Sequence, residues 1–286
     1  MTKRHAIFTA SDEHRIGFLL KHWLPSLQEN VDLTHIDVNV LDYGLTEPHR
    51  DELQARGVCC HRCVKDGHVG NVRVRDVAVI GAKLNYDQIL AVDSGDVIFQ
   101  ADIAVLFEQG KGRFHAVIEE LNVPIHHVFM DRSDFPPEVR RRILYYLYDK
   151  PVINGGFLLG PPAMFRKFWE KFGELGVGHQ CFCTDQMVLN YMLHQDGFKT
   201  LDRRYNYVTI SMLSPISIRD GVVYDAAGEV IPVVHNAGMK DFAHKIGDFG
   251  YGPQYNHRRW FAPIFTRFLI HLGNVWKWYK AVLGIL

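Results

Sequence analysis

Apolar and polar positions along the first third of the chain follow the pattern of an α/β protein. Apolar residues repeat at helical spacing from Ile16 to Leu27 and from Val77 to Leu84, and Pro25 is expected to interrupt the first of these helices. Four short apolar runs predict strands, at residues 6–10, 36–41, 58–64 and 89–92. The order β-α-β-β-α-β predicts an open, mostly parallel sheet with helices on its faces.

The run at 89–92 is apolar throughout, which predicts a strand buried on both faces. Ligands of such sheets bind beyond the carboxyl ends of strands, so the residues after Val92 form a candidate site by position. Farther along, Met164 to Phe172 predicts a helix, Thr184 is expected to cap another, and 230–234 predicts the last strand. Without internal repeats, residues 1–250 are expected to form one domain, followed by a helical tail at 251–286.

Composition excludes some classes of protein. The 286 residues include 32 Lys+Arg and 32 Asp+Glu, so bulk positive charge is not available for binding nucleic acid. An apolar fraction of 47% supports a compact core. The N-terminal apolar run is too short for a signal peptide, and the chain has no uncharged apolar run of about 18 residues, so we expect a cytoplasmic protein.

Five cysteines raise the alternative of a zinc site. They lie in two groups, Cys59-Cys60-His61-Arg62-Cys63 and Cys181-Phe182-Cys183. No second ligand pair follows at zinc-finger spacing, so buried reduced thiols on a strand are the favoured interpretation.

Carboxylates after the 89–92 strand are the first candidate for chemistry. Asp93 and Asp96, separated by Ser94 and Gly95, can converge on a hard cation, although the same residues are typical of a plain turn. His235 follows the last predicted strand, where a structural role is the alternative to metal binding. An imidazole beside two carboxylates favours Mn²⁺, with Mg²⁺ as the second choice.

Three further segments carry candidate polar groups. Asn154 offers an amide for sugar hydroxyls, and Gly155-Gly156 would allow close approach of a ligand to a backbone after a strand. Asp185 and Gln186 are expected in the first turn of the helix capped by Thr184. Gly238 and Lys240 lie beyond His235, where the lysine could reach a diphosphate.

Taken in order, these segments resemble the GT-A fold sugar-nucleotide transferases, most closely glycosyltransferase family 8, which includes glycogenin-like and lipooligosaccharide galactosyltransferase-like enzymes. The family pattern is a D-x-D metal motif after a strand, an N-x-G segment, a D-Q pair opening a helix, and a late H-x-x-G-x-x-K. The counterparts here are Asp93 to Asp96, Asn154 to Gly156, Asp185-Gln186, and His235 to Lys240.

Two departures from the family pattern affect the site. The metal motif reads D-S-G-D, one residue longer than D-x-D, so either both Asp93 and Asp96 ligate through a wider turn or only one does. The late motif has one residue fewer before Lys240 and lacks the Pro-Trp that often follows.

The resemblance implies further roles. It places Thr9, Ala10 and Asp12 at the nucleoside, and Arg75 on a helix against the donor, with Arg73 as the alternative. It assigns Asp93, Ser94, Asn154, Gly155, Gly156, Gly238 and Lys240 to the donor, and Asp185 and Gln186 to catalysis near the anomeric carbon.

The activity that the resemblance implies is metal-dependent transfer of a sugar from a nucleotide-sugar. UDP is the expected nucleotide, and the configuration at the anomeric carbon is expected to be retained. Asp185 acting as a general base would instead give inversion.

The tail indicates the acceptor. Residues 249–286 contain no Asp or Glu and combine five basic residues with aromatic and aliphatic residues at helical spacing. Such helices lie at anionic membrane interfaces, which predicts peripheral attachment through residues 257–286 to the inner face of the membrane and a lipid-linked or envelope glycan as acceptor. A terminal helix pair packed on the body or on a dimer partner is the alternative.

Two other function classes remain open from the sequence. One is a different Asp-metal enzyme, a nucleotidyltransferase or phosphohydrolase, although the segment Thr9-Ala10-Ser11-Asp12-Glu13 lacks the glycine-rich loop of nucleotidyltransferases. The other is a non-catalytic protein that binds a sugar-nucleotide or glycan.

Overall fold

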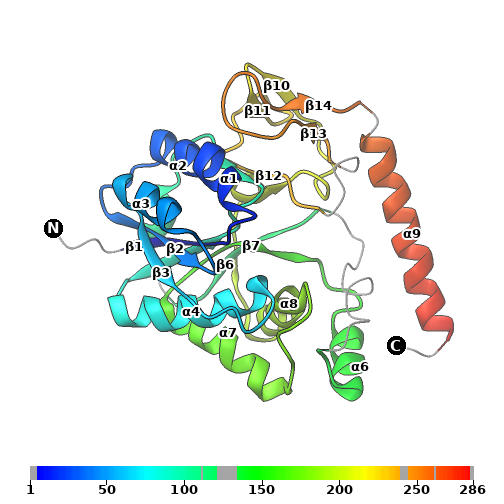
Figure 1. The fold of residues 1–286 in the computed structure, drawn as a ribbon. Coiled ribbons are helices and arrows are strands. Elements are labelled where there is room, and N and C mark those ends of the chain that lie inside the picture. The colour runs from blue at the N-terminus through cyan, green and yellow to red at the C-terminus, as the bar shows by residue number, and fades with distance from the viewer. Residues whose placement is uncertain (1–4, 111, 121–133, 239–243, 261, 284–286) are drawn as a thin grey trace.

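A seven-stranded sheet occupies the centre of the molecule in a computed structural model that describes residues 5–110, 112–120, 134–238, 244–260 and 262–283 (Figure 1). Its strands, in sheet order, are β3 (Cys59–Arg62), β2 (Ile36–Asp42), β1 (His5–Ser11), β4 (Gln88–Val92), β7 (Ile153–Gly160), β6 (His115–Ile118) and β8 (Lys199–Thr200). The four strands from β3 to β4 are parallel, β7 is antiparallel to both of its neighbours, and β6 is parallel to β8. The predicted mostly parallel α/β sheet is confirmed.

Helices cover both faces of this sheet. The described helical segments are α1 (Ile16–Phe18), the π-helical turn η1 (Leu19–Trp23), α2 (Leu24–Asn30), α3 (Glu47–Ala55), α4 (Val69–Leu84), the 3₁₀ turn η2 (Ala104–Glu108), α6 (Pro137–Tyr146), α7 (Pro162–Leu175), α8 (Thr184–Asp196), the 3₁₀ turn η3 (Arg203–Asn206) and α9 (Ala262–Val282). Because side chains alternate across a strand, Ile7 packs with η1 and α2, whereas Phe8 packs with α4, α7 and α8.

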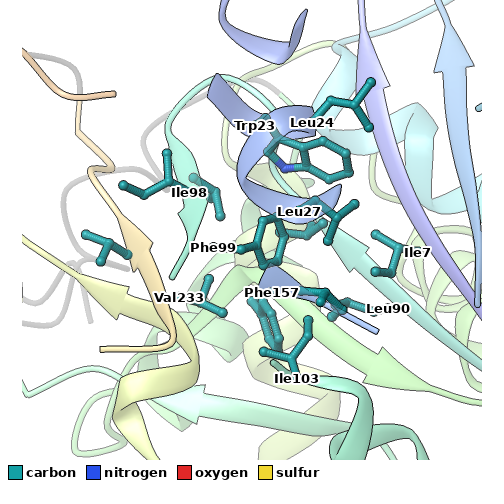
Figure 2. Close-up of a cluster of buried hydrophobic side chains, with 14 of the residues drawn as sticks. Ile7, Trp23, Leu24, Leu27, Leu90, Ile98, Phe99, Ile103, Phe157 and Val233 are labelled. Atoms are coloured by element: carbon teal, nitrogen blue, oxygen red, sulfur yellow. The ribbon is translucent and has the colours of Figure 1, made fainter. Parts of the chain in front are cut away.

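Short strands beyond the central sheet complete the architecture. They are β5 (Val97–Phe99), β9 (Tyr207–Val208) and β12 (Val233–His235) in one sheet, β10 (Ser217–Arg219) with β11 (Val222–Tyr224), and β13 (Ile246–Gly247) with β14 (His257–Arg258). Figure 2 shows the apolar cluster that joins β5 and β12 to the central sheet, in which Trp23, Phe99 and Phe157 are fully buried. This packing fixes the small sheet that carries His235 against the end of β4.

Several local predictions were wrong. Helical structure continues through Pro25 to Asn30, because Pro25 lies in the first turn of α2, where a missing N–H costs no hydrogen bond. The helix α3 was missed, since most of its surface is polar and only Leu53 is buried. The strand predicted at 230–234 is β12, which begins at Val233 because Pro232 has no N–H to donate, and it is not the last strand, since β13 and β14 follow it.

Details of three other motifs also differ. Gly155 and Gly156 lie inside β7 rather than after a strand. The N-cap position of α8 is Cys183, and Thr184 is the first helical residue. The first cysteine group does include the strand β3, but it is an edge strand, so Cys59 is exposed and Cys60 and Cys63 are half-buried rather than buried. Among the described residues, none of the cysteines belongs to a cluster able to hold a metal.

Candidate functional site

Asp93, Asp96 and His235 converge at the carboxyl end of β4. The backbone N–H of Asp93 donates to the carbonyl of Gly156 at 3.0 Å, which holds the turn after β4 beside β7. Antiparallel pairing of β12 with β5 places His235 opposite Val97, one residue beyond Asp96. One potential ligand atom from each of the three side chains lies within 4.8 Å of the others, so the group is able to hold a metal ion.

The His235 ring presents one nitrogen to this cluster. Its Nδ1 lies 2.9 Å from Oδ1 of Asn206, while Nε2 lies 3.4 Å from Asp96 and 3.6 Å from Asp93. The ring is buried, and among the described residues Nε2 has no aligned hydrogen-bond partner. A buried nitrogen aimed at two carboxylates matches the donor set of Mn²⁺ or Mg²⁺, with the imidazole favouring Mn²⁺.

Charge at the cluster is partly compensated by Arg73 of α4. Its guanidinium donates to Asp93 and lies 3.7 Å from Asp185. Burial acts to raise the pKa of Asp93, but Arg73 and His235 hold it below its ordinary value. For Asp185, burial raises the pKa against the opposing effect of Arg73, and the neighbouring Asp93 raises it further. Arg73 therefore connects the cluster of Asp93, Asp96 and His235 with the start of α8.

Arg75, the first choice for a donor contact, lies elsewhere. Its guanidinium forms ion pairs with Asp66 at 2.7 Å and with Asp76 at 2.8 Å and lies over the Trp169 ring. Side chains two residues apart on a helix point in different directions, so only one of the two arginines can face Asp93. The structure brings the alternative, Arg73, to the site.

Gln186 and Asn154 lie at the site with their amides already engaged. Oε1 of Gln186 accepts from the Gly155 N–H at 2.8 Å, and its Nε2 donates to the carbonyl of Ile153. The Asn154 amide accepts from the Gly156 N–H and donates to Glu119, each at 2.8 Å. In this arrangement both side chains hold β7 in place.

Residues at the end of β1 reach the same edge of the sheet. Thr9 is buried and its hydroxyl donates to the Val92 carbonyl at 2.7 Å, while Ser94 donates to the Ala10 carbonyl at 2.6 Å. These two bonds join the ends of β1 and β4. Asp12 is partly exposed and forms an ion pair with Lys65 at 3.0 Å.

A polar cavity of about 390 Å³ opens beside the cluster of Asp93, Asp96 and His235. Its lining includes Gly95, Asp96 and Gly238, with Arg259 and the ring of Phe249. Phe18 also lines it and stacks on Phe249 at a centroid distance of 5.8 Å. Lys240 lies outside the described residues.

Two polar residues at the site had not been identified from the sequence. Glu119 is buried behind Asn154, and burial raises its pKa even though Asn154 and Ser211 donate to it. A carboxylate directly after the apolar run at 116–118 was the available signal for it. Asn206, which contacts His235, comes from η3 and has no local sequence signal.

Comparison with solved structures identifies the fold as that of GT-A glycosyltransferases, as the sequence motifs predicted. The glycosyltransferase GlyE of Streptococcus pneumoniae TIGR4 matches all of this chain at 17% identity and a TM-score of 0.51, with the chain spanning 64% of its length. An active-site mutant of LgtC matches over 92% of this chain and 95% of its own, at 18% identity and a TM-score of 0.54. The bifunctional glycosyltransferase WbbM matches over 84% of this chain and 46% of its own, at 14% identity and a TM-score of 0.54.

Sequence comparison adds no closer relative. No family model matches the chain, and no curated protein matches it. At these identities the structural likeness establishes the fold, and the chemistry has to be argued from the site.

Proposed function

We propose that this protein is a metal-dependent glycosyltransferase that moves a sugar from a nucleotide-sugar to a glycan or lipid-linked acceptor. The expected donor is a UDP-sugar. The observation that carries the proposal is the convergence of Asp93, Asp96 and Nε2 of His235 beside a polar cavity, at the carboxyl end of a strand in a GT-A fold. Such an edge is where α/β sheets bind ligands.

The roles of the residues follow from the charge that the reaction develops. Breaking the anomeric bond leaves negative charge on a diphosphate, which a divalent cation held by Asp93, Asp96 and His235 would stabilise. Around that group, Arg73 neutralises the carboxylates of Asp93 and Asp185 from the side of α4. Gly238 and Arg259 in the cavity lining, together with Lys240 from the sequence motif, are the proposed contacts to the diphosphate.

The donor sugar is proposed to lie against β7 and the start of α8. Gly156 of β7 lies directly against His235 and Asp93, and the Asp185 carboxylate at the start of α8 lies 3.7 Å from the Arg73 guanidinium. Thr9, Ala10 and Asp12 are the proposed contacts to the nucleoside. Thr9 and Ala10 are buried and would contact it through their backbone groups. We propose retention of configuration, and NMR of the product at early times distinguishes it from inversion.

The acceptor proposal rests on α9, which runs along one side of the molecule (Figure 1). Its described apolar side chains are widely exposed, among them Ile264, Phe268, Leu272, Trp278 and Tyr279. No described helix is long and apolar enough to cross a bilayer. We propose that α9 lies in the plane of an anionic membrane and brings the site to a lipid-linked or envelope glycan.

Hydrolysis and transfer assays with a panel of UDP-, GDP- and CMP-sugars, with and without Mn²⁺, test the proposed function. We expect Mn²⁺-dependent turnover of one donor class, and a loss of about 100-fold or more in kcat/KM for Asp93→Asn, because one group that stabilises the developing charge is removed. Asp51→Asn, an exposed carboxylate on α3, is the matched control.

The same panel separates the alternatives. Tight nucleotide binding without turnover of any donor would overturn the proposal in favour of a binding protein. Release of inorganic pyrophosphate from nucleoside triphosphates with sugar phosphates would overturn it in favour of a nucleotidyltransferase, and release of phosphate in favour of a phosphohydrolase.

A further inference from the structure

A continuous chain of hydrogen bonds lies behind the His235 ring, on the side away from Asp93 and Asp96. His235 Nδ1 lies 2.9 Å from Asn206 Oδ1, and Asn206 Nδ2 lies 2.9 Å from Asn154 Oδ1. Asn154 Nδ2 in turn lies 2.8 Å from Oε1 of Glu119. The chain therefore connects the ring to a buried carboxylate through two amides.

One backbone N–H sets the direction of every bond in this chain. The Gly156 N–H can only donate, and it lies 2.8 Å from one side-chain atom of Asn154, so that atom must be the oxygen. The Asn206 atom that faces the same oxygen must then be its NH₂ group, which leaves the Asn206 oxygen facing the ring. An oxygen acceptor at Nδ1 requires the His235 proton at Nδ1.

The groups in the chain have little freedom to adopt another arrangement. Asn206 and His235 are at most 1% exposed, and Glu119 is 5% exposed. They come from η3, from β12 and from the segment after β6, while Asn154 lies in β7. Four separate parts of the fold therefore converge on one imidazole orientation.

We propose that Asn206, oriented by Asn154 and Glu119, is a positioning residue that holds His235 with its proton on Nδ1 and its Nε2 lone pair directed at the Asp93–Asp96 cluster. The other tautomer would direct an N–H at a bound cation and could not ligate it. This inference deepens the proposed metal site and rests on it only for the effect on cation binding, because the tautomer is a property of the metal-free protein.

The first experiment measures the tautomer directly. Long-range ¹H–¹⁵N NMR correlations of metal-free protein carrying ¹⁵N-labelled histidine, recorded where the His235 ring is neutral, report which nitrogen is protonated, and His235→Gln assigns the signals. We expect Nδ1–H in the wild type. A wild-type ring protonated at Nε2 would overturn the proposal without any substitution at Asn206.

The second experiment changes the acceptor. Asn206→Leu removes the oxygen at Nδ1, so we expect a mixed tautomer and about 10- to 100-fold weaker Mn²⁺ binding by titration calorimetry, the scale of losing a hydrogen-bond partner of a metal-binding histidine. Asn206→Asp keeps an acceptor at the same place and should restore the Nδ1–H tautomer. Unchanged tautomer and unchanged Mn²⁺ affinity in Asn206→Leu would overturn the proposal.

A matched control exists elsewhere in the chain. Asn39 is also fully buried, and its Oδ1 lies 2.8 Å from Nε2 of His61. This pair joins β2 and β3 at one edge of the central sheet. Asn39→Leu removes the same kind of bond and should leave the His235 signals and the Mn²⁺ affinity as in the wild type. If Mn²⁺ does not bind the wild-type protein, the proposed metal site fails, while the metal-free tautomer still confirms or overturns the positioning role of Asn206.

Discussion

At the scale of single residues, Gly156 explains how two of the candidate ligands, His235 and Asp93, fit against β7. A Cβ at this position would lie 2.4 Å from Cε1 of His235 and 2.8 Å from Oδ2 of Asp93, both closer than side-chain atoms approach each other. It would also lie 2.9 Å from the Asn154 oxygen. The absence of a side chain at Gly156 therefore allows the imidazole and the carboxylate to lie against β7.

Gly156→Ala is expected to displace His235 and Asp93 and to weaken Mn²⁺ binding by about 10-fold or more, since overpacking a buried site costs about 1–3 kcal/mol. Titration calorimetry with Mn²⁺ measures the effect. Gly173→Ala is the control, because an added Cβ there meets nothing within 4 Å. If Gly156→Ala bound Mn²⁺ with wild-type affinity, cation binding would not depend on this packing.

The Asp185 carboxylate faces the site from the first turn of α8, 3.7 Å from the Arg73 guanidinium. We expect Asp185→Asn to keep the fold and to lower kcat by about 100-fold, with a smaller effect on KM, because the negative charge next to Arg73 is lost. Steady-state kinetics with the active donor checks this. An equal loss in Asp196→Asn, at the far end of α8, would mean that the effect is not specific to the site.

At the scale of elements, the start of α8 depends on the segment that precedes it. Asp134 accepts hydrogen bonds from the backbone N–H of Gln180 and Cys181, at 3.2 and 2.7 Å, and from the Thr184 hydroxyl at 2.8 Å. From the other side, Asn71 of α4 accepts from the Asp185 N–H at 2.9 Å. Two side chains distant in sequence therefore fix where α8 begins and where Asp185 lies.

Asp134→Ala is expected to cost about 1–3 kcal/mol of unfolding free energy, because the buried Thr184 hydroxyl and two partly buried backbone N–H groups lose their acceptor. Hydrogen exchange should accelerate at the amides of Gln180 and Cys181, and chemical denaturation measures the total cost. Asp196→Ala breaks a 2.9 Å ion pair with Lys167 at the other end of α8 and should cost less than about 1 kcal/mol. Equal protection of the two amides in wild type and Asp134→Ala would contradict this account of α8.

At the scale of the whole molecule, the zero net charge is the sum of two opposite regions. Residues 1–248 contain all 32 acidic residues and 27 of the 32 basic ones, so their net charge is −5, and residues 249–286 carry +5. The basic region includes α9 with its exposed apolar side chains. Attraction to anionic lipid is therefore confined to one end of the chain.

Flotation with vesicles that contain anionic lipid tests this distribution. We expect the full chain to float with the vesicles, more weakly at high salt, and a Phe268→Ser, Leu272→Ser, Tyr279→Ser variant to remain at the bottom. A Val64→Ser, Val79→Ser, Tyr145→Ser variant removes similarly exposed apolar side chains from the body and is the control. Equal flotation of both variants would rule out α9 as the docking element.

Several strands of the central sheet and the motif positions could be predicted from the sequence because they depend on local pattern. Apolar runs predicted β1, β2 and β4, and the position of Asp93 after β4 marked the site. The choice between Arg73 and Arg75 could not be made, since it depends on how α4 is rotated against the sheet. The engagement of Gln186 with β7 was equally invisible, because its partners are backbone groups of another segment.

The sequence by itself determined a mostly parallel α/β fold, a pair of aspartates at a strand end and a basic apolar tail, because each of these features depends on residues that are close together in the sequence. Only the tertiary structure decided that Asn206 meets His235 and that Glu119 lies behind them. These groups are up to 116 residues apart and are joined by the packing of β5 and β12 on the central sheet, so their meeting has no counterpart in local pattern.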